Sequence, residues 1–321
     1  MVVKLLKDIK HELYLRKVSK QRAQQARDTL ASEPFASHFR ALEGSFEIPA
    51  LVHTEGIWAI AMVKNEADII EASVRHMFAQ GISRMLIVDN NSDDGTYDIL
   101  LKLAEEFPLH VGKDTEPAYY QSEKMTWLAH HVQRAGATWV VPFDADEFWV
   151  GFDTTLAQVL ESSPYAIEHA MLFNLFPQDS GAYALDIRQH IDGKVCFRSW
   201  PQSVLTMGNH SALLPGKEGY GHIAIMHVPW RSRAQLQRKL QQGAAALELA
   251  DHDESLGYHW RANAHLDGQE LERLWHNLVT GGEVPESLSW RPQGELYPFD
   301  SIPTRFRPVH ELRVSAGLIQ E

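Results

Sequence analysis

The stretch WVVPFDADEF, residues 139–148, carries the strongest signal for the fold of this chain. An apolar segment runs directly into Asp144 and Asp146, two carboxylates separated by one residue. A buried strand would deliver both acids at its carboxyl end, where an open α/β sheet forms its ligand crevice. Paired oxygen ligands at such a place suit Mg²⁺ or Mn²⁺, ions that often bind a substrate's phosphates. The competing interpretation is a solvated acidic turn, and the pattern around the stretch disfavours it.

Strand-like and helix-like patterns alternate along the chain from residue 57 to residue 143. This alternation predicts βαβ units and therefore an α/β fold with a mainly parallel central sheet flanked by helices. After residue 148 the alternation weakens and predicts an irregular α+β part, while residues 31–55 and 282–300 show no regular period. The predicted strands are 57–63, 84–89, 109–112, 138–143, 170–176, 194–200 and 222–228, and the predicted helices are 66–80, 95–107, 122–135, 231–249 and 269–280.

The composition is that of a soluble globular protein, with 321 residues, 44% hydrophobic and 22% charged. A single cysteine, Cys196, excludes an intramolecular disulfide framework and a cysteine-based zinc site, as expected in a reducing compartment. No apolar run reaches the roughly 20 residues that span a bilayer. The first residues also lack the apolar core and cleavage site of a secretory signal. These features predict a cytoplasmic protein.

Charge is distributed unevenly between the start of the chain and the rest. Residues 1–30 hold eight Lys and Arg against three Asp and Glu, a net charge of +5. The whole chain carries −12, so the remaining residues carry −17. Nucleic-acid binding relies on basic surface, and the acidic body therefore argues against nucleic acid as a partner.

The basic N-terminal segment follows a helical pattern. Five apolar residues recur at the spacing of one helix face, with basic residues between them. A basic amphipathic helix can lie on an anionic membrane surface, here the inner face. The alternative is a helix that packs on the body or on a second subunit of a homo-oligomer, and both remain open. The apolar positions are Val2, Leu5, Leu6, Ile9 and Leu13.

Three polar loops follow successive predicted strands, at residues 64–66, 89–96 and 144–147. All three should open onto the same edge of the sheet, which is where a ligand crevice belongs. The second loop also suits an Asx-rich turn in which Asp94 caps the next helix, and both roles are compatible. Lys124, on the helix before the acidic strand, is either a phosphate contact or an exposed helical lysine.

The segment VKNEADIIEASVRHMFAQGISRMLIVDNNSDDGT (63–96), followed by FDADEF, resembles the family-2-like glycosyltransferases with the glycosyltransferase A fold. The similarity is greatest to the subgroup with V-K-N-E and D-x-D-E-F motifs, and it covers residues 57–150. It reappears at HVPWRS (227–232) and Lys239, which are similar to that subgroup's His–aromatic–Arg–Ser segment. The order and spacing of these motifs within a βαβ frame make the resemblance specific.

The resemblance implies roles for individual residues. Glu66 and Asp89 match positions that bind the base and ribose of a nucleotide, with Lys64 and Asn91 beside them in the same loops. Asp144 matches an aspartate near the ribose and the metal ion, and Asp146 matches the one that ligates the divalent ion. His227 matches a histidine that completes the metal shell or contacts the pyrophosphate. Arg231, at a strand-to-helix junction, can clamp the diphosphate with two hydrogen bonds, and helix capping by Ser232 is the competing role for that turn.

The implied function is a Mn²⁺- or Mg²⁺-dependent transfer of a sugar from a nucleotide-diphosphate-sugar, a UDP-sugar, to a glycan or lipid-linked acceptor. The ion would offset negative charge on the leaving diphosphate. No motif identifies the base that deprotonates the acceptor hydroxyl, and the candidates are Asp251, Asp253 and Glu254. Trp260 follows them and offers an apolar platform for a sugar ring.

Three other functions compete with sugar transfer. A nucleotidyltransferase that forms nucleotide-sugars usually has a Gly-rich phosphate loop after its first strand, where this chain has Val63–Lys64–Asn65–Glu66. A metallohydrolase is disfavoured because no His-Glu-x-x-His signature is present. A non-catalytic binding module is disfavoured because the paired acids are intact.

The predicted organisation is an N-terminal helix and linker (1–55), a nucleotide-sugar-binding half (56–150) and an acceptor-side half with C-terminal helices (151–321).

Overall fold

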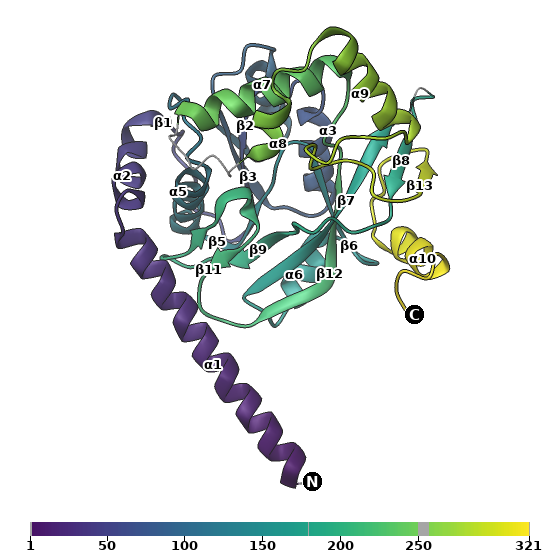
Figure 1. Ribbon diagram of the computed structural model, residues 1–321. Helices are drawn as coiled ribbons and strands as arrows, with labels where there is room; N and C mark the ends of the chain where they lie inside the picture. The colour runs from purple at the N-terminus through teal and green to yellow at the C-terminus, as the bar shows by residue number, and fades with distance from the viewer. Residues whose placement is uncertain (1, 179, 250–256, 321) are drawn as a thin grey trace.

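The computed structural model describes every residue except Met1, Asp179, residues 250–256 and Glu321. An 11-stranded mixed sheet runs through the described part of the chain, with helices on both faces (Figure 1). The α/β fold with a large, mainly parallel central sheet, predicted from the sequence, is confirmed. The longest hydrogen-bonded path through this sheet has the order β1-β4-β3-β2-β5-β9-β7-β12-β6, and β8 and β13 extend it from β7.

Seven strands lie where the apolar segments predict them. Both faces of these strands are covered, which explains their near-continuous apolar runs. In β2, for example, Ile57 and Ala59 face one core cluster while Trp58 and Ile60 face the other. The seven are β2 (Gly56–Val63), β3 (Arg84–Asp89), β4 (Leu109–Asp114), β5 (Ala137–Pro142), β7 (Ile167–Pro177), β9 (Lys194–Arg198) and β12 (Glu218–His227).

Six helices were expected, and all six are present. The helix after β2 is shorter than predicted, because residues 66–69 form a turn in which the Glu66 carbonyl accepts from the backbone N–H groups of Ile69 and Ile70. The six are α1 (Val2–Ala31), α3 (Ile70–Ala79), α4 (Thr96–Glu106), α5 (Gln121–Arg134), α7 (Arg233–Leu249) and α9 (Gly268–Thr280).

Two segments that the sequence predicts to be irregular contain regular secondary structure, so the prediction is wrong for both. Residues 31–55 contain a helix, α2 (Phe35–Ser45), whose residue Leu42 joins the core cluster beneath α5. Residues 282–300 contain β13 (Leu296–Phe299), which pairs antiparallel with β8 (Tyr183–Asp186). Both elements are short and are stabilised by partners far away in the sequence, so local periodicity does not reveal them. The other additions are β1 (Phe46–Glu47), β6 (Glu147–Gly151), α6 (Leu156–Ser162), β10 (Val204–Leu205), the 3₁₀ turn η1 (Met207–Asn209), β11 (Ala212–Leu213), α8 (Tyr258–Asn263) and α10 (Arg307–Ser315).

Strand directions bring distant segments to one edge of the sheet. The four parallel strands β4, β3, β2 and β5 all end there. β9 is antiparallel to β5, so it begins at that edge with Lys194. β7 is antiparallel to β9, and β12 is parallel to β7, so β12 ends at the same edge with His227. Residues that are more than 80 positions apart along the chain are therefore adjacent in space.

A separate apolar cluster supports the C-terminal helices. Trp230 and Leu236 pack there with residues of α9 such as Leu274. The helices α7, α8 and α9 lie above the carboxyl edge of the sheet, at the top of Figure 1, whereas α10 lies lower, beside the C-terminus. The boundary predicted near residue 150 stays a prediction, and the hydrogen-bonded sheet is continuous across it because β5 pairs with β9.

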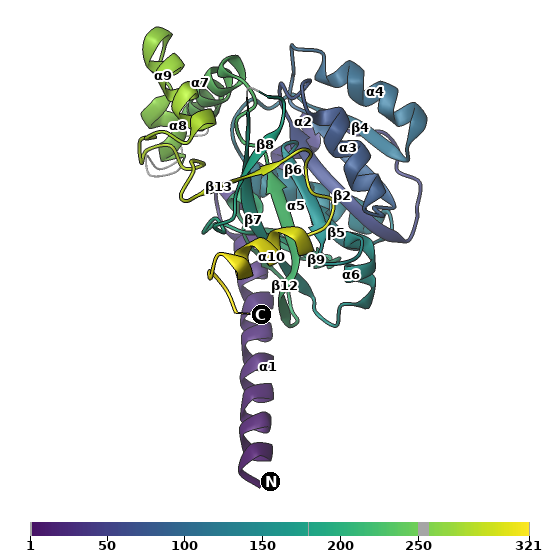
Figure 2. The ribbon, with the colours of Figure 1, turned by 90° about the vertical axis from the view of Figure 1, so that its right-hand side faces the viewer.

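The helix α1 projects away from the body in both views (Figures 1 and 2). Its second half is anchored: the Ser19 hydroxyl accepts from the backbone N–H of Gly216 at 2.8 Å, and Ala26 is fully buried. The helix predicted for the N-terminal segment is thus confirmed and is longer than its apolar stripe. None of the described helices combines the length and apolarity that crossing a bilayer requires.

Candidate active site

A cavity of about 540 Å³ opens at the carboxyl edge of the sheet, beneath α7 and α8. The predicted loops at residues 64–66 and 144–147 line it, and the predicted loop at residues 89–96 contributes one residue, Asn90. The cavity is also lined by residues that follow β4 and by the ends of β9 and β12. The polar lining residues discussed below are Lys64, Glu66, Asn90, Lys124, Asp144, Asp146, Glu147, Lys194, His227 and Lys239.

Asp146 is an almost fully enclosed acid of the site, with 3% of its side chain exposed. Its Oδ2 atom accepts from Lys239 Nζ and lies 3.6 Å from both His227 Nε2 and Arg231 Nη1. Burial alone would raise the pKa of this carboxyl, but the cationic Lys239 and Arg231 help to hold the pKa well below its usual range. Asp146 is therefore a permanent negative charge surrounded by cationic and polar groups.

His227 faces Asp146 with its Nε2 atom. The other ring nitrogen, Nδ1, lies 2.9 Å from the amide oxygen of Asn174, an atom that can only accept. The proton therefore resides on Nδ1, and Nε2 presents a lone pair toward the carboxylate. Burial lowers the pKa of His227, despite the opposing attraction of Asp146, and keeps the ring neutral. Two acceptor atoms thus face each other, an arrangement that needs a positive charge close by.

Asp144 is more open, with 37% of its side chain exposed, and its partner was not predicted. Lys194 Nζ, from the first residue of β9, lies 2.7 Å from Asp144 Oδ2 and 3.1 Å from Glu147 Oε1. Burial raises the pKa of Glu147 to about 7, and Lys194 opposes that rise. Lys194 therefore neutralises Asp144 and Glu147, while Lys239 neutralises Asp146 between them.

Arg231 is fixed by two acids that precede α3. Its guanidinium donates to Glu66 and, at 2.7 Å from Nε and 3.0 Å from Nη2, to Asp68. Burial raises the pKa of Glu66 to about 7 while Arg231 and Lys239 lower it. Arg231 does not line the cavity itself, but its third nitrogen, Nη1, is buried and points toward Asp146 without a hydrogen-bond partner in the described structure.

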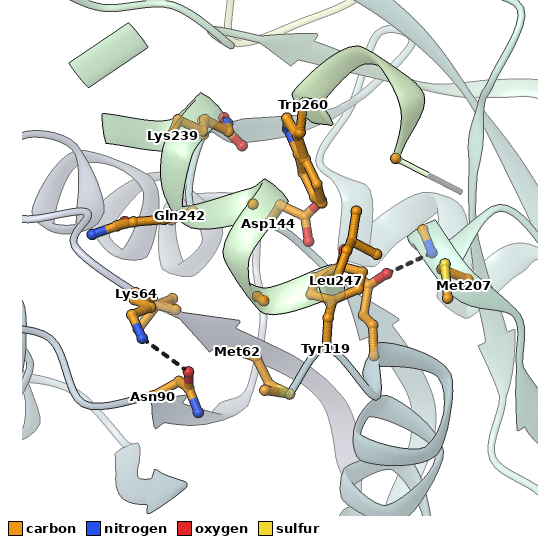
Figure 3. A pocket seen from close by; sticks show the side chains of 18 of the residues that line it. Met62, Lys64, Asn90, Tyr119, Asp144, Met207, Lys239, Gln242, Leu247 and Trp260 are labelled. Carbon is orange, nitrogen blue, oxygen red and sulfur yellow. Dashed lines mark hydrogen bonds and ion pairs between the residues drawn. The ribbon is translucent and has the colours of Figure 1, made fainter. Parts of the chain in front are cut away.

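The opposite end of the cavity contains a buried polar network. The Asn90 side chain donates to Asp114 Oδ2 at 2.9 Å and faces Lys64 Nζ at 3.5 Å on its other side (Figure 3). Lys124 is only 2% exposed and forms a 2.6 Å ion pair with Asp114. The expectation of an exposed helical Lys124 is thus wrong, because Asp114 at the end of β4 holds it inside. Asp114 lies two residues beyond the predicted strand 109–112, and the observed β4 extends to it. The signal that could have identified it is its place at the carboxyl end of a parallel strand.

Asp89 and Asn91 do not line the cavity. The Oδ1 atom of Asp89 accepts from the backbone N–H of Ser92 at 3.0 Å, whereas its buried Oδ2 has no hydrogen-bond partner in the described structure. Asn91 is exposed with a φ angle of 54°. Asp94 accepts from the backbone N–H of Thr96 at 3.0 Å, but the N-cap of α4 is Gly95, so the prediction of Asp94 as the helix cap is wrong by one residue.

Apolar side chains close the cavity beside the acids. Trp260, Leu247 and Tyr119 gather on one side of the close-up, away from Lys64 and Asn90 (Figure 3). The Tyr119 and Trp260 rings meet edge to face, with 5.4 Å between their centroids.

The three candidates for the catalytic base, Asp251, Asp253 and Glu254, lie outside the described residues.

No group of three or more His, Cys, Asp or Glu side chains is placed to hold a metal ion within residues 2–178, 180–249 and 257–320. Asp146 and His227 are the predicted metal ligands that the fold brings together, while Asp144 turns to Lys194. The assignment of these three residues to a metal ion stays a prediction.

Residues 58–167 match the family described as Glycosyl transferase family 2. The family predicted from the V-K-N-E and D-x-D-E-F motifs is confirmed for this segment, and with it the prediction of a glycosyltransferase. The matched residues contain the first two polar loops and the acidic loop.

Two solved structures are distantly similar. S. aureus TarS 1–349 in complex with UDP has 13% identity over 65% of this chain and 70% of its own, with a TM-score of 0.34. A putative glucose-1-phosphate thymidylyltransferase from Bacillus anthracis in complex with a sucrose has 10% identity over 80% and 95%, with a TM-score of 0.28. Likenesses this weak say nothing about a ligand of this chain. No curated protein matches the sequence significantly.

Proposed function

We propose that the protein transfers a sugar from a UDP-sugar, or a related nucleotide-diphosphate-sugar, to a glycan or lipid-linked acceptor. The observation that carries the proposal is the pair of acceptor atoms, Asp146 Oδ2 and His227 Nε2, that face each other 3.6 Å apart at the edge of the cavity. The segment that matches the transferase family supplies Asp146, and β12 supplies His227. The loop after β2 has no glycine, and no observation favours a nucleotidyltransferase over this function.

The residues present fit a divalent cation. One carboxylate oxygen and one imidazole nitrogen are typical ligands of Mn²⁺, and Mg²⁺ commonly takes only one or two carboxylates, with water and substrate phosphates as its other ligands. The Asn174 hydrogen bond fixes the tautomer that leaves Nε2 free to coordinate. Lys239 Nζ stands in for such a cation at Asp146. A bound divalent ion would offset the charge of the leaving diphosphate without any proton transfer.

The chain's own residues divide the remaining tasks. Arg231 is held by Glu66 and Asp68, and its Nη1, which lacks a hydrogen bond, faces Asp146, next to which a diphosphate would lie. Asn90 and Lys64 offer polar groups for the nucleotide at the far end of the cavity. We assign removal of the acceptor proton to one of Asp251, Asp253 and Glu254, and contact with the acceptor's sugar ring to Trp260.

UDP is expected to stabilise the protein against heat, and more strongly with Mn²⁺. Ligand at a hundred times its Kd adds about 2.7 kcal/mol to the free energy of unfolding, which a melting curve detects. Asp89→Ala should lose stabilisation by UDP even without metal, because the unpaired Oδ2 of Asp89 is its proposed contact with base or ribose. The matched control is Asp93→Ala, an exposed acid of the same loop. A wild-type melting temperature that is unmoved by any nucleotide or nucleotide-sugar, with or without Mn²⁺, would refute the function.

We further propose that α1 attaches the enzyme to an anionic membrane surface. The helix projects from the body, and Leu13 and Tyr14 are 59% and 62% exposed on it. Each basic residue near such a surface contributes about 1 kcal/mol, screened by salt. The alternative, pairing of α1 with a second copy, would be seen as a dimer in solution.

Leu13→Glu is expected to reduce co-sedimentation with vesicles that contain anionic lipid, because it places a carboxylate in the apolar stripe. Leu318→Glu is the matched control, since Leu318 is also an exposed leucine but lies near the opposite end of the chain. Transfer to a soluble acceptor should remain normal in both variants. Equal sedimentation of the two variants at low salt would contradict the membrane role, and a change of oligomeric state in Leu13→Glu alone would replace it with self-association.

A further inference from the structure

Lys239 lies on α7 at the point where that helix crosses the acidic loop. Its ammonium contacts Asp146 Oδ2 and lies 5.8 Å and 5.2 Å from the ring centroids of Trp230 and Trp290. The side chain remains 19% exposed and lines the cavity. A cation between two indole rings is attracted by both, and it can shift along them without losing that attraction.

The acid that Lys239 contacts is the same acid that a divalent ion would need. Asp146 is buried, and the contact of Lys239 Nζ with its Oδ2 is the shortest described for that carboxylate. Of its other neighbours, Arg231 is committed to Glu66 and Asp68, and His227 is hydrogen-bonded to Asn174 through its other ring nitrogen. Lys239 is thus the group that neutralises Asp146 directly while no donor is bound.

A divalent ion and the ammonium cannot occupy the same oxygen. An ion coordinated at about 2.1 Å from Asp146 Oδ2 would lie next to Nζ, and like charges at that distance repel strongly in a buried site. A diphosphate arriving with the ion brings negative charge to the same place. The lysine stem is flexible and carries three donors suited to phosphate oxygens, so the ammonium can exchange one anion for the other.

We propose that Lys239 is a diphosphate-binding residue that is held on Asp146 until the donor and its divalent ion displace it. This assignment rests on the proposed function and adds a residue to it. The exchange keeps Asp146 charge-paired both before and after binding. It also makes donor binding and metal binding depend on each other, because the ion enters easily only when the diphosphate has drawn the lysine away.

Lys239→Met tests the exchange, because methionine keeps an apolar stem against Trp230 and Trp290 but removes the charge. With MnCl₂ alone, the full-length variant should bind Mn²⁺ about tenfold more tightly than the wild type, since nothing competes for Asp146. With saturating Mn²⁺, it should bind UDP about tenfold more weakly, since the phosphate contact is lost. Affinity for uridine, which has no phosphate, should not change. Calorimetric titration measures all three.

The two opposite shifts are the signature of the exchange. Arg233→Met is the matched control: it removes one positive charge from the same helix, at an exposed residue that pairs loosely with Glu272 at 3.7 Å, and it should change neither affinity. Unchanged Mn²⁺ affinity in Lys239→Met would overturn the competition, and unchanged UDP affinity would overturn the phosphate contact. Loss of both affinities would show that Lys239 only supports the fold of the site. A wild-type protein that binds neither Mn²⁺ nor UDP would instead refute the proposed function itself.

Discussion

Asp146→Asn is expected to lower the rate of sugar transfer by on the order of a thousandfold, the size of effect seen when a group that stabilises transition-state charge is removed. The amide keeps the shape of the carboxylate but cannot bind a divalent ion or balance Lys239 and Arg231. The stabilisation of UDP binding by Mn²⁺ should disappear with the activity. Turnover and UDP affinity, each measured with and without Mn²⁺, check both effects.

The control for this variant is Asp153→Asn. Asp153 follows β6 by two residues and forms an exposed ion pair with Arg307, so its loss should leave transfer within a few-fold of normal. Circular dichroism should show that both variants are folded. Near-normal turnover of Asp146→Asn at saturating donor and Mn²⁺ would remove Asp146 from the reaction.

Lys194→Met is expected to destabilise the protein by about 3 kcal/mol, the typical cost of removing one partner from a buried ion pair. Lys194 neutralises both Asp144 and Glu147, and Glu147 is almost fully buried. Without the lysine, the two carboxylates face each other and Asp146 with no counter-charge on that side. Urea unfolding of the variant and the wild type gives the difference in the free energy of unfolding.

The comparison variant is Lys217→Met. Lys217 pairs with Glu12 at 2.6 Å, but both side chains are about half exposed, and such pairs contribute about 0–1 kcal/mol. The expected contrast between the two Lys→Met substitutions therefore comes from burial alone. If both variants lose the same small amount of stability, then Lys194 does not hold the acidic loop together.

The parts of the fold that the sequence predicted well are those with local signals. Residues 84–89 form a strand with the predicted bounds because every residue from Met85 to Asp89 is buried and the run is apolar until its last position. The helix α5 starts and ends within one residue of its prediction because its buried face repeats at helical spacing. The acid pair was evident for the same reason: both residues follow one apolar strand.

The parts that were missed depend on contacts between distant segments. β6 begins at Glu147, directly after the acids, and its only described strand partner is β12, about 75 residues later. Lys194 resembles any lysine at the start of a strand, and only the antiparallel pairing of β9 with β5 places it beside Asp144. Asp114 and Asn90 form one network only because β3 and β4 are neighbours. No local pattern encodes such a neighbourhood.

The connection between β5 and β6 also decides where the protein can move. These strands are only four residues apart along the chain, yet β9, β7 and β12 lie between them in the sheet. The link folds into a turn in which the backbone N–H of Glu147 donates to the Asp144 carbonyl at 3.0 Å, and the backbone N–H of Val228 donates to the Asp146 carbonyl at 2.9 Å. Asp144 and Asp146 are therefore as immobile as the core itself. We therefore expect any movement that admits substrate to come from the part of the lining supplied by α7 and α8, which holds no strand of the sheet.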